Sequence, residues 1–283
     1  MQAARLAAAL VIGIGLGDAA AADAQTVVAN VQAPGCDLRA QGETLEAQGD
    51  LLGAAALLEA ALRSTPTDPH LHWRIARDLL HHAERNPQLD ADRLISLYER
   101  AREWAHAGRA LVPDCAECCL YEFAGTARLA SVRGMAQALG SVREAGQLLQ
   151  QCLENPPRWS DASGSEEASL YYGASVYYRL MPDSTWMSWA TGQRSDATRA
   201  VGLARRAVEL EGERARYRLE LGAALLCDGA RREDAAALAE GRRWLDDTAG
   251  GTGIDAERAR RLREAAPDQA CELSHDDPFE RRE

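Results

Sequence analysis

The sequence contains no lysine, so all 32 of its basic residues are arginine. Against 43 acidic residues they leave a formal net charge of −11. This charge argues against a nucleic-acid binder, which needs a basic surface to replace counterions. Aromatic residues are scarce at 5%, while 46% of the chain is apolar, mostly Ala and Leu. Because Ala and Leu favour helices over strands, the composition excludes wholesale disorder and predicts an all-α protein.

Long apolar runs are missing except near the N-terminus, where Leu6 to Leu16 follow the single cation Arg5. With the triplet Ala22-Asp23-Ala24, this run predicts a secretory signal peptide over 1–24, cleaved after Ala24, with Ala22 as the second choice. A buried N-terminal helix is the alternative. The run is shorter than the roughly 20 residues that a membrane-spanning helix needs. No cysteine follows it directly, so there is no lipobox. We expect an exported, periplasmic protein without a membrane span.

Seven cysteines in an oxidising compartment are disulfide candidates, and the odd number leaves one unpaired. The motif Cys115-Ala116-Glu117-Cys118-Cys119 lacks the His of a haem-attachment site, the second ligand pair of a zinc site and the βαβ surroundings of a thioredoxin-like redox motif. Structural bridging is therefore the favoured interpretation.

Hairpin geometry narrows the pairing of these cysteines. Cys118 and Cys119 begin one predicted helix and Cys152 ends the helix that returns beside it, so Cys152 is expected to pair with Cys118 or Cys119. Cys227 and Cys271 form a weaker second candidate pair, and Cys36 is left as a free thiol or an intermolecular partner. The alternative is that all seven stay reduced.

Large and small apolar residues recur at the spacing of a 34-residue helical hairpin. The first unit has Leu38, Gly42 and Leu45 in one helix, a turn at Gly49-Asp50, and Ala54, Leu58 and Ala61 in a second helix before Pro66. Further units begin near 73, 116, 166 and 217, with loops at 158–165 and 183–195. The sequence thus predicts a right-handed α-solenoid of about five tetratricopeptide-like (TPR-like) hairpins with a C-terminal capping helix. Its predicted bounds are 35–266, after a linker at 25–34 and before a charged tail at 267–283.

Three stretches carry a family resemblance: His72–Arg77, Leu97–Ala105 and Tyr177–Pro182. With their spacing, the chain resembles the TPR superfamily, and within it the periplasmic T component of TRAP-type transporters and the regulator-of-microtubule-dynamics proteins. Predicted export favours the first branch. That resemblance implies a helical scaffold that assembles with itself and docks a solute-binding partner. The missing lipobox departs from the T-component pattern and puts membrane attachment in doubt.

No constellation in the sequence indicates an enzyme. His70, His72, His81 and His82 lack further ligands at metal-binding spacing, so we expect solvated or capping histidines and no metal or cofactor. Gly250–Gly253 follows a predicted helix, which excludes a dinucleotide turn, and no G-x-S-x-G elbow is present.

Binding is the other class of function, because stacked hairpins form an extended inner face from their first helices. Trp73 and Tyr177 fall at core positions of the repeat, whereas Tyr171, Tyr172 and Tyr178 do not, so at least one of these three should face the groove. Arg74, Arg77 and Arg179 are candidate donors to carboxylates or carbonyls, with solvated helix charges as the favoured interpretation of Arg74 and Arg77. Trp186 and Trp189, in the 183–195 insertion, are expected beside the binding face.

Two functional hypotheses follow. The first is a non-enzymatic scaffold that binds a protein or peptide, with a solute-binding protein as the transport-associated candidate and self-association as a further expectation. The alternative is a carrier for a small apolar molecule, with the 183–195 insertion covering the groove. An open groove would favour the first, and a closed apolar pocket the second.

Overall fold

A computed structural model describes residues 37–273 except 87, 134, 163 and 182. The predicted signal peptide 1–24, the linker 25–34, Cys36 and residues 274–283 lie outside the described residues.

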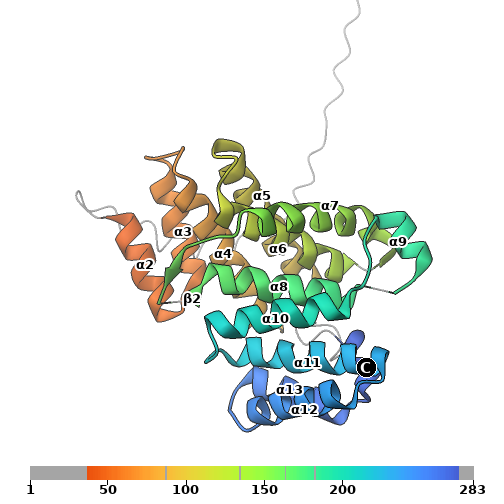
Figure 1. The fold of residues 1–283 in the computed structure, drawn as a ribbon. Helices are drawn as coiled ribbons and strands as arrows, with labels where there is room; N and C mark the ends of the chain where they lie inside the picture. The colour runs from red at the N-terminus through yellow and green to blue at the C-terminus, as the bar shows by residue number, and fades with distance from the viewer. Residues whose placement is uncertain (1–36, 87, 134, 163, 182, 274–283) are drawn as a thin grey trace, which may run out of the picture.

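The described chain folds into five antiparallel helical hairpins and a further C-terminal helix, as Figure 1 shows. The hairpins are α2 (Leu38–Gln48) with α3 (Leu51–Leu62), α4 (Pro69–Arg85) with α5 (Ala91–Leu111), α6 (Ala116–Arg133) with α7 (Met135–Glu154), α8 (Glu166–Leu180) with α10 (Ala197–Leu210), and α11 (Ala215–Arg232) with α12 (Ala235–Ala249). The further helix is α13 (Ile254–Glu264). The predicted all-α solenoid is confirmed.

Successive hairpins stack through their first helices. Helix α4 contacts α6, α6 contacts α8, and α8 contacts α11, while each second helix also touches the first helix of the next hairpin. This row of first helices (α4, α6, α8 and α11) is called the inner face below.

Capping residues at the helix N-termini, and glycines where the chain turns or where two helices come close, explain the local structure. Aspartate caps six helices by accepting a hydrogen bond from the first-turn backbone, at Asp37, Asp50, Asp68, Asp90, Asp196 and Asp234. The turn between α2 and α3 needs Gly49, whose φ of 85° disfavours other residues. Helices α11 and α12 approach closely at two glycines, since a Cβ on Gly241 would lie 2.9 Å from the Gly222 carbonyl oxygen.

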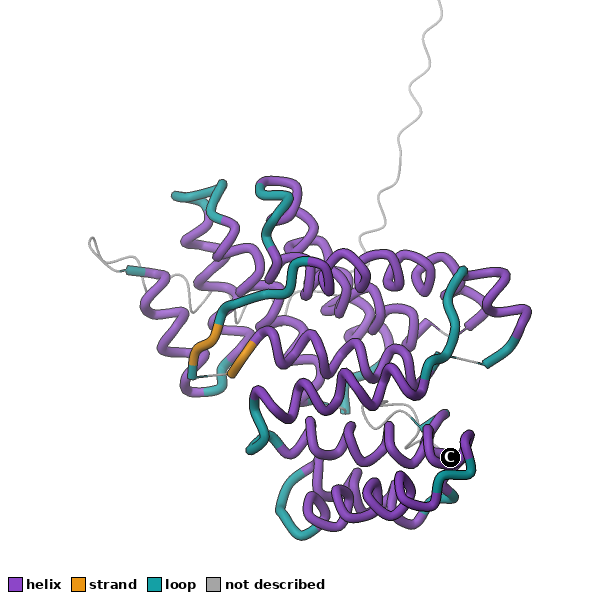
Figure 2. Tube along the Cα trace, in the orientation of Figure 1, coloured by secondary structure: helices purple, strands orange, loops and turns teal. Residues whose placement is uncertain are grey.

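The two predicted loops carry some secondary structure. Residues 158–165 contain a short antiparallel hairpin, β1 (Ser160–Asp161) with β2 (Gly164–Ser165), drawn in orange in Figure 2. The 183–195 segment contains helix α9 (Thr185–Thr191), which contacts α7.

Residues 267–273 belong to the packed domain, which corrects the predicted tail at 267–283. Pro267–Cys271 form the 3-10 helix η1 against α11, Ala270 is buried, and Cys271 is bonded to Cys227. The disulfide and the buried apolar side chain therefore fix residues 267–273, although the charged composition of the tail predicts a frayed end.

Three disulfides lie among the described residues. Cys119 is bonded to Cys152, one of the two partners predicted for it, and Cys227 is bonded to Cys271. The third joins Cys115 to Cys118, a pair left unassigned by the sequence. The main apolar core runs continuously from α3 to α11, and a second cluster packs α11, α12, α13 and η1 together.

Candidate binding site

A cavity of about 310 Å³ lies on the inner face and is called the inner cavity below. Its lining comes from all four helices of the inner face, with Val142 and Ala145 added from α7. It is neither sealed nor flat, and most of its lining is apolar. Its size lies at the lower end of the range for small-molecule pockets, about 300–1,000 Å³.

Aromatic rings supply much of the lining, through Tyr121, Phe123, Tyr172, Tyr177 and Tyr217. The Tyr121 hydroxyl donates to Glu166 Oε2 at 2.5 Å and the Tyr177 hydroxyl donates to the Val142 carbonyl oxygen at 3.0 Å. The Tyr217 hydroxyl lies 3.1 Å from Ser169 Oγ. Because these hydroxyls already have protein partners, the rings offer a ligand mainly apolar surface.

Charged side chains join the lining on one side of the inner cavity. Glu84 Oε1 accepts from Arg128 Nη2 at 2.6 Å, and Glu84 Oε2 accepts from Arg216 Nη2 at 3.3 Å. The Arg216 guanidinium also lies 5.2 Å from the centre of the Tyr172 ring. One carboxylate thus bridges α6 and α11, and fixes two arginines beside the apolar lining.

His81 also lines the inner cavity and is uncharged at neutral pH. Burial lowers its pKa to about 3, and the nearby charge of Arg216 acts in the same direction while Glu84 opposes it. The expectation of solvated or capping histidines is wrong as to solvation for His72, which is buried with Nδ1 2.8 Å from the Asp68 carbonyl oxygen, whereas His81 is half-buried. No group of three or more metal-ligating side chains is assembled within the described part of the chain.

Arg74 and Arg77 correct another expectation, because both are buried rather than solvated. Arg77 Nη2 donates to Glu46 Oε2 at 2.9 Å and its Nη1 donates to Asp161 Oδ2 at 3.0 Å, with Glu166 Oε1 3.5 Å away. Arg74 Nη2 donates to the same Glu46 oxygen at 2.6 Å. These ion pairs join α2, α4, β1 and α8, and we call them the Arg77 network.

The Arg77 network contains carboxyl groups that hold protons easily. Burial raises the pKa of Glu166 to about 6, even though the Tyr121 hydrogen bond and Arg77 favour its charged form. Burial and the nearby Glu46 charge also raise the pKa of Asp78 well above its usual value. More carboxylates than arginines meet in this region, so protonation relieves the repulsion between them.

Arg179, a candidate binding residue, is fully buried and holds the protein together instead. Its Nη2 donates to Glu220 Oε2 at 2.9 Å, and its Nη1 donates to the carbonyl oxygens of Ala270 and Leu273 at 2.5 and 3.0 Å. Glu220 Oε1 also accepts from Ser175 Oγ at 2.6 Å. Arg179 therefore ties α8 to α11 and to the C-terminal segment, where a ligand cannot reach it.

The structure separates the predicted aromatic site residues. Tyr172 lines the inner cavity, but Tyr171 and Tyr178 do not. Tyr178 is buried against Arg199, and its hydroxyl accepts from Gln150 Nε2 at 2.5 Å. Tyr177, assigned to the core by its repeat position, lines the inner cavity as well. The binding role of Tyr172 stays a prediction.

The described residues of the insertion are not part of the lining of the inner cavity. No described residue of 183–195 lines it, and α9 contacts α7 instead. Trp189 is 83% exposed, and the Trp186 side chain lies outside the described residues. The lining residues that sequence reasoning missed are Phe123, Arg128, Arg216 and Glu84. The sequence placed these residues on predicted first helices, but so it placed many others, and nothing else in the sequence distinguished them as lining residues.

Comparisons with solved structures identify the fold. The structure is similar to TTC0263, a thermophilic TPR protein of Thermus thermophilus, with a TM-score of 0.54 and 19% identity over 84% of this chain and 98% of that one. The fold is that of a tetratricopeptide-repeat protein. MamA protein is also matched, at a TM-score of 0.40 and 14% identity over 81% of this chain and 95% of that one. No family model and no curated protein matches the chain.

Proposed function

We propose that the protein is an exported, non-enzymatic TPR scaffold that binds a partner protein or peptide at its inner face. The supporting observation is the inner cavity, a partly open apolar hollow on the face from which stacked hairpins usually bind. An apolar side chain of the partner would fill this hollow. Exposed apolar surface of this kind marks contact sites because burying it is favourable.

The candidate partner is an exported solute-binding protein, which would associate the scaffold with transport. This partner rests on the sequence resemblance to the T-component branch, since the structural likeness concerns the fold alone. Export rests on the signal-peptide pattern of residues 1–24. Within the described residues, no helix combines the length and apolarity needed to cross a membrane.

The test is a comparison of two tryptophan variants in a periplasmic pull-down with mass spectrometry. Ala127→Trp adds bulk inside the inner cavity, and Ala110→Trp adds the same side chain at an exposed position of α5. A partner captured by wild type and by Ala110→Trp, but reduced tenfold or more with Ala127→Trp, supports the proposal. Equal capture by both variants contradicts it.

A small apolar ligand is the second candidate, favoured by the apolar lining and by a volume of about 310 Å³. The version in which the 183–195 segment closes the groove has no support, because α9 lies against α7. Solvent extraction of purified protein, followed by mass spectrometry, tests it. A bound apolar compound present at near one per chain in wild type, and lost in Ala127→Trp, would favour this candidate over a protein partner.

A further inference from the structure

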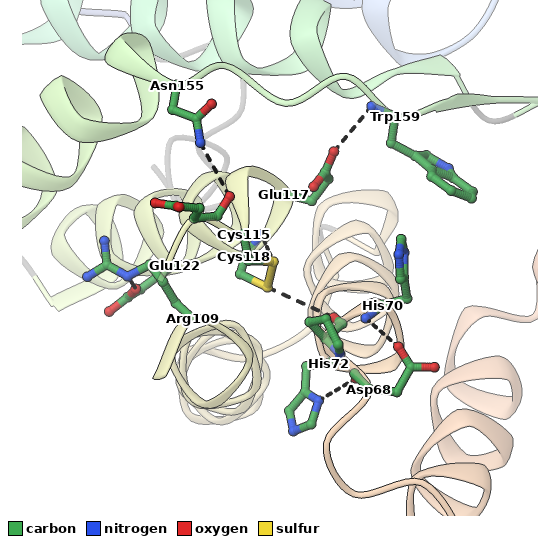
Figure 3. The surroundings of a disulfide bond; sticks show 12 residues. Asp68, His70, His72, Arg109, Cys115, Glu117, Cys118, Glu122, Asn155 and Trp159 are labelled. Atoms are coloured by element: carbon green, nitrogen blue, oxygen red, sulfur yellow. Dashed lines mark hydrogen bonds and ion pairs between the residues drawn. A yellow bond between two sulfur atoms is a disulfide. The ribbon is translucent and has the colours of Figure 1, made fainter. Parts of the chain in front are cut away.

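The Cys115–Cys118 disulfide lies at the first turn of α6, as Figure 3 shows. The Cys115 carbonyl oxygen accepts from the Cys119 backbone N–H at 3.0 Å, which makes Cys115 the capping residue of this 18-residue helix. Its Sγ accepts from the Cys118 backbone N–H at 3.2 Å. The sulfur therefore occupies the place of a capping side-chain acceptor, where a thiolate would receive a stronger hydrogen bond than a disulfide sulfur does.

The two sulfurs have different surroundings. Cys115 keeps 9% of its surface exposed, whereas Cys118 has none. Cys118 Sγ lies 3.9 Å from the Pro69 carbonyl oxygen, which can accept from a thiol, and α5 covers it so closely that a Cβ on Gly108 would lie 2.8 Å away. Cys115 is thus the less enclosed of the two residues, while Cys118 is placed to leave as a buried thiol.

Nearby acids oppose a thiolate at Cys115, and one of them is already engaged. Asp114 precedes Cys115 in the chain, and Glu117 follows it by two residues. Glu117 Oε1 accepts from the backbone N–H groups of Arg158 and Trp159, each at 3.2 Å, as Figure 3 shows in part. Those two donors offset the Glu117 charge, and the Cys118 N–H still points at the sulfur.

The three disulfides also differ in what they hold. Cys119–Cys152 joins α6 to α7 and closes 33 residues, and Cys227–Cys271 joins α11 to η1 and closes 44. Cys115–Cys118 closes only three residues that the helical turn already keeps together. Reducing the Cys115–Cys118 bond breaks no link between two helices. This disulfide is therefore expected to contribute the least of the three to stability.

We propose that Cys115–Cys118 is a redox-active disulfide that oxidises the dithiol of a partner protein. A thiolate of the partner attacks Cys115 Sγ, forming a mixed disulfide, and Cys118 Sγ leaves and takes a proton. The partner's second thiol then attacks its own mixed-disulfide sulfur and releases Cys115. Two electrons and two protons pass to the Cys115–Cys118 pair, and the partner becomes a disulfide. This inference goes beyond the non-enzymatic role proposed for the inner cavity and does not depend on it.

The first experiment uses dithiothreitol as the dithiol. The folded chain is equilibrated at graded ratios of reduced to oxidised dithiothreitol, quenched in acid, alkylated and peptide-mapped. Cys115 and Cys118 should become alkylated at a ratio at least tenfold lower than the other four bonded cysteines, with the helical circular dichroism unchanged. Reduction of all three disulfides at one ratio, or of this pair only as helicity is lost, would overturn the proposal.

Two single variants test the roles of the two sulfurs. In Cys118→Ser the Cys115 thiol should react with 5,5′-dithiobis(2-nitrobenzoate) at least tenfold faster than the Cys118 thiol does in Cys115→Ser, because Cys115 is the less buried residue and its sulfur receives the N–H. Equal rates, or a faster reaction at Cys118, would contradict the assignment. Circular dichroism checks both variants, and if either is unfolded the wild-type titration decides alone.

Discussion

Two buried arginines organise the two halves of the molecule in different ways. Arg77, in α4, is shared among carboxylates from three elements, α2, β1 and α8. Arg179, in α8, pairs with Glu220 of α11 and also donates to carbonyl oxygens of the C-terminal segment. Both guanidiniums are almost fully excluded from solvent.

The region around Arg77 therefore binds protons, whereas the ion pair of Arg179 holds helices together. Around Arg77, acids outnumber bases and the pKa values of Glu166 and Asp78 are raised, so this half of the molecule exchanges protons under mildly acidic conditions. At Arg179 the Glu220 carboxylate is held inside the core, and removing a partner from a buried ion pair is strongly destabilising. Stability should therefore depend on pH through the first region and on an intact ion pair through the second.

The largest effect is expected from Glu220→Gln, which leaves Arg179 buried without its carboxylate. The free energy of unfolding should fall by about 3–5 kcal/mol, measured by urea denaturation. Glu209→Gln, at an exposed end of α10, is the control and should change stability by less than about 0.5 kcal/mol. If Glu220→Gln lowers the free energy of unfolding no more than the control does, the stabilising role of the Arg179 ion pair is contradicted.

Removing Cys227–Cys271 by a double alanine substitution should cost about 3–4 kcal/mol, because a 44-residue loop is released. The same change at Cys115 and Cys118 should cost less than about 2 kcal/mol, since that loop spans three residues. Thermal or urea unfolding of the two double variants measures both. Equal losses would show that loop length does not govern these bonds.

His81→Gln tests the pH dependence of the first region. The folded pKa of His81 is about 3, against 6.5 ordinarily, so its contribution to stability is present above pH 6.5 and is lost as the pH falls toward 3. Between pH 6.5 and 5 this corresponds to about 2 kcal/mol. The variant should lose less stability than wild type over that range in urea titrations, and an unchanged pH profile would refute the lowered pKa of His81.

Glu166→Gln should have the opposite sign. Because the folded pKa of Glu166 is about 6 against 4.5 ordinarily, its contribution favours folding at low pH and declines as the pH rises from 4.5 to 6. That decline corresponds to at most about 2 kcal/mol. Urea unfolding at pH 4.5 and 7 should show a variant that loses less stability on raising the pH than wild type does. A larger loss in the variant would reverse the inferred direction.

The smallest effect is expected from Trp189→Ala, since this side chain is 83% exposed. The melting temperature should change by no more than about 1 °C, because few contacts are removed. If the side chain contacts a partner, the same variant should weaken partner capture in the periplasmic pull-down. A fall of several degrees would show that Trp189 is packed in solution.

The lining of the inner cavity could not be predicted from the repeat pattern of the sequence. Repeat positions placed Tyr177 in the core and Tyr178 outside it, yet Tyr177 lines the inner cavity and Tyr178 is buried beside Arg199 and Gln150. A repeat pattern describes one hairpin and its neighbour, whereas these side chains respond to α7 and α10 together. The same limit applies to Arg77, whose partners Glu46 and Glu166 lie 31 and 89 residues away.

The sequence by itself determined the hairpins, because helix spacing, aspartate caps and glycine turns act between residues that are close along the chain. Their number, their order and the capping helix follow from those local signals. Only the tertiary structure decided which side chains share a space, as with Glu84 and Arg216, which meet at the inner cavity from positions 132 residues apart. It also decided which of Cys118 and Cys119 pairs with Cys152, the Cys115–Cys118 bond, and the burial of the arginines. Charge and side-chain length do not specify burial until neighbouring helices provide counter-charges and exclude water.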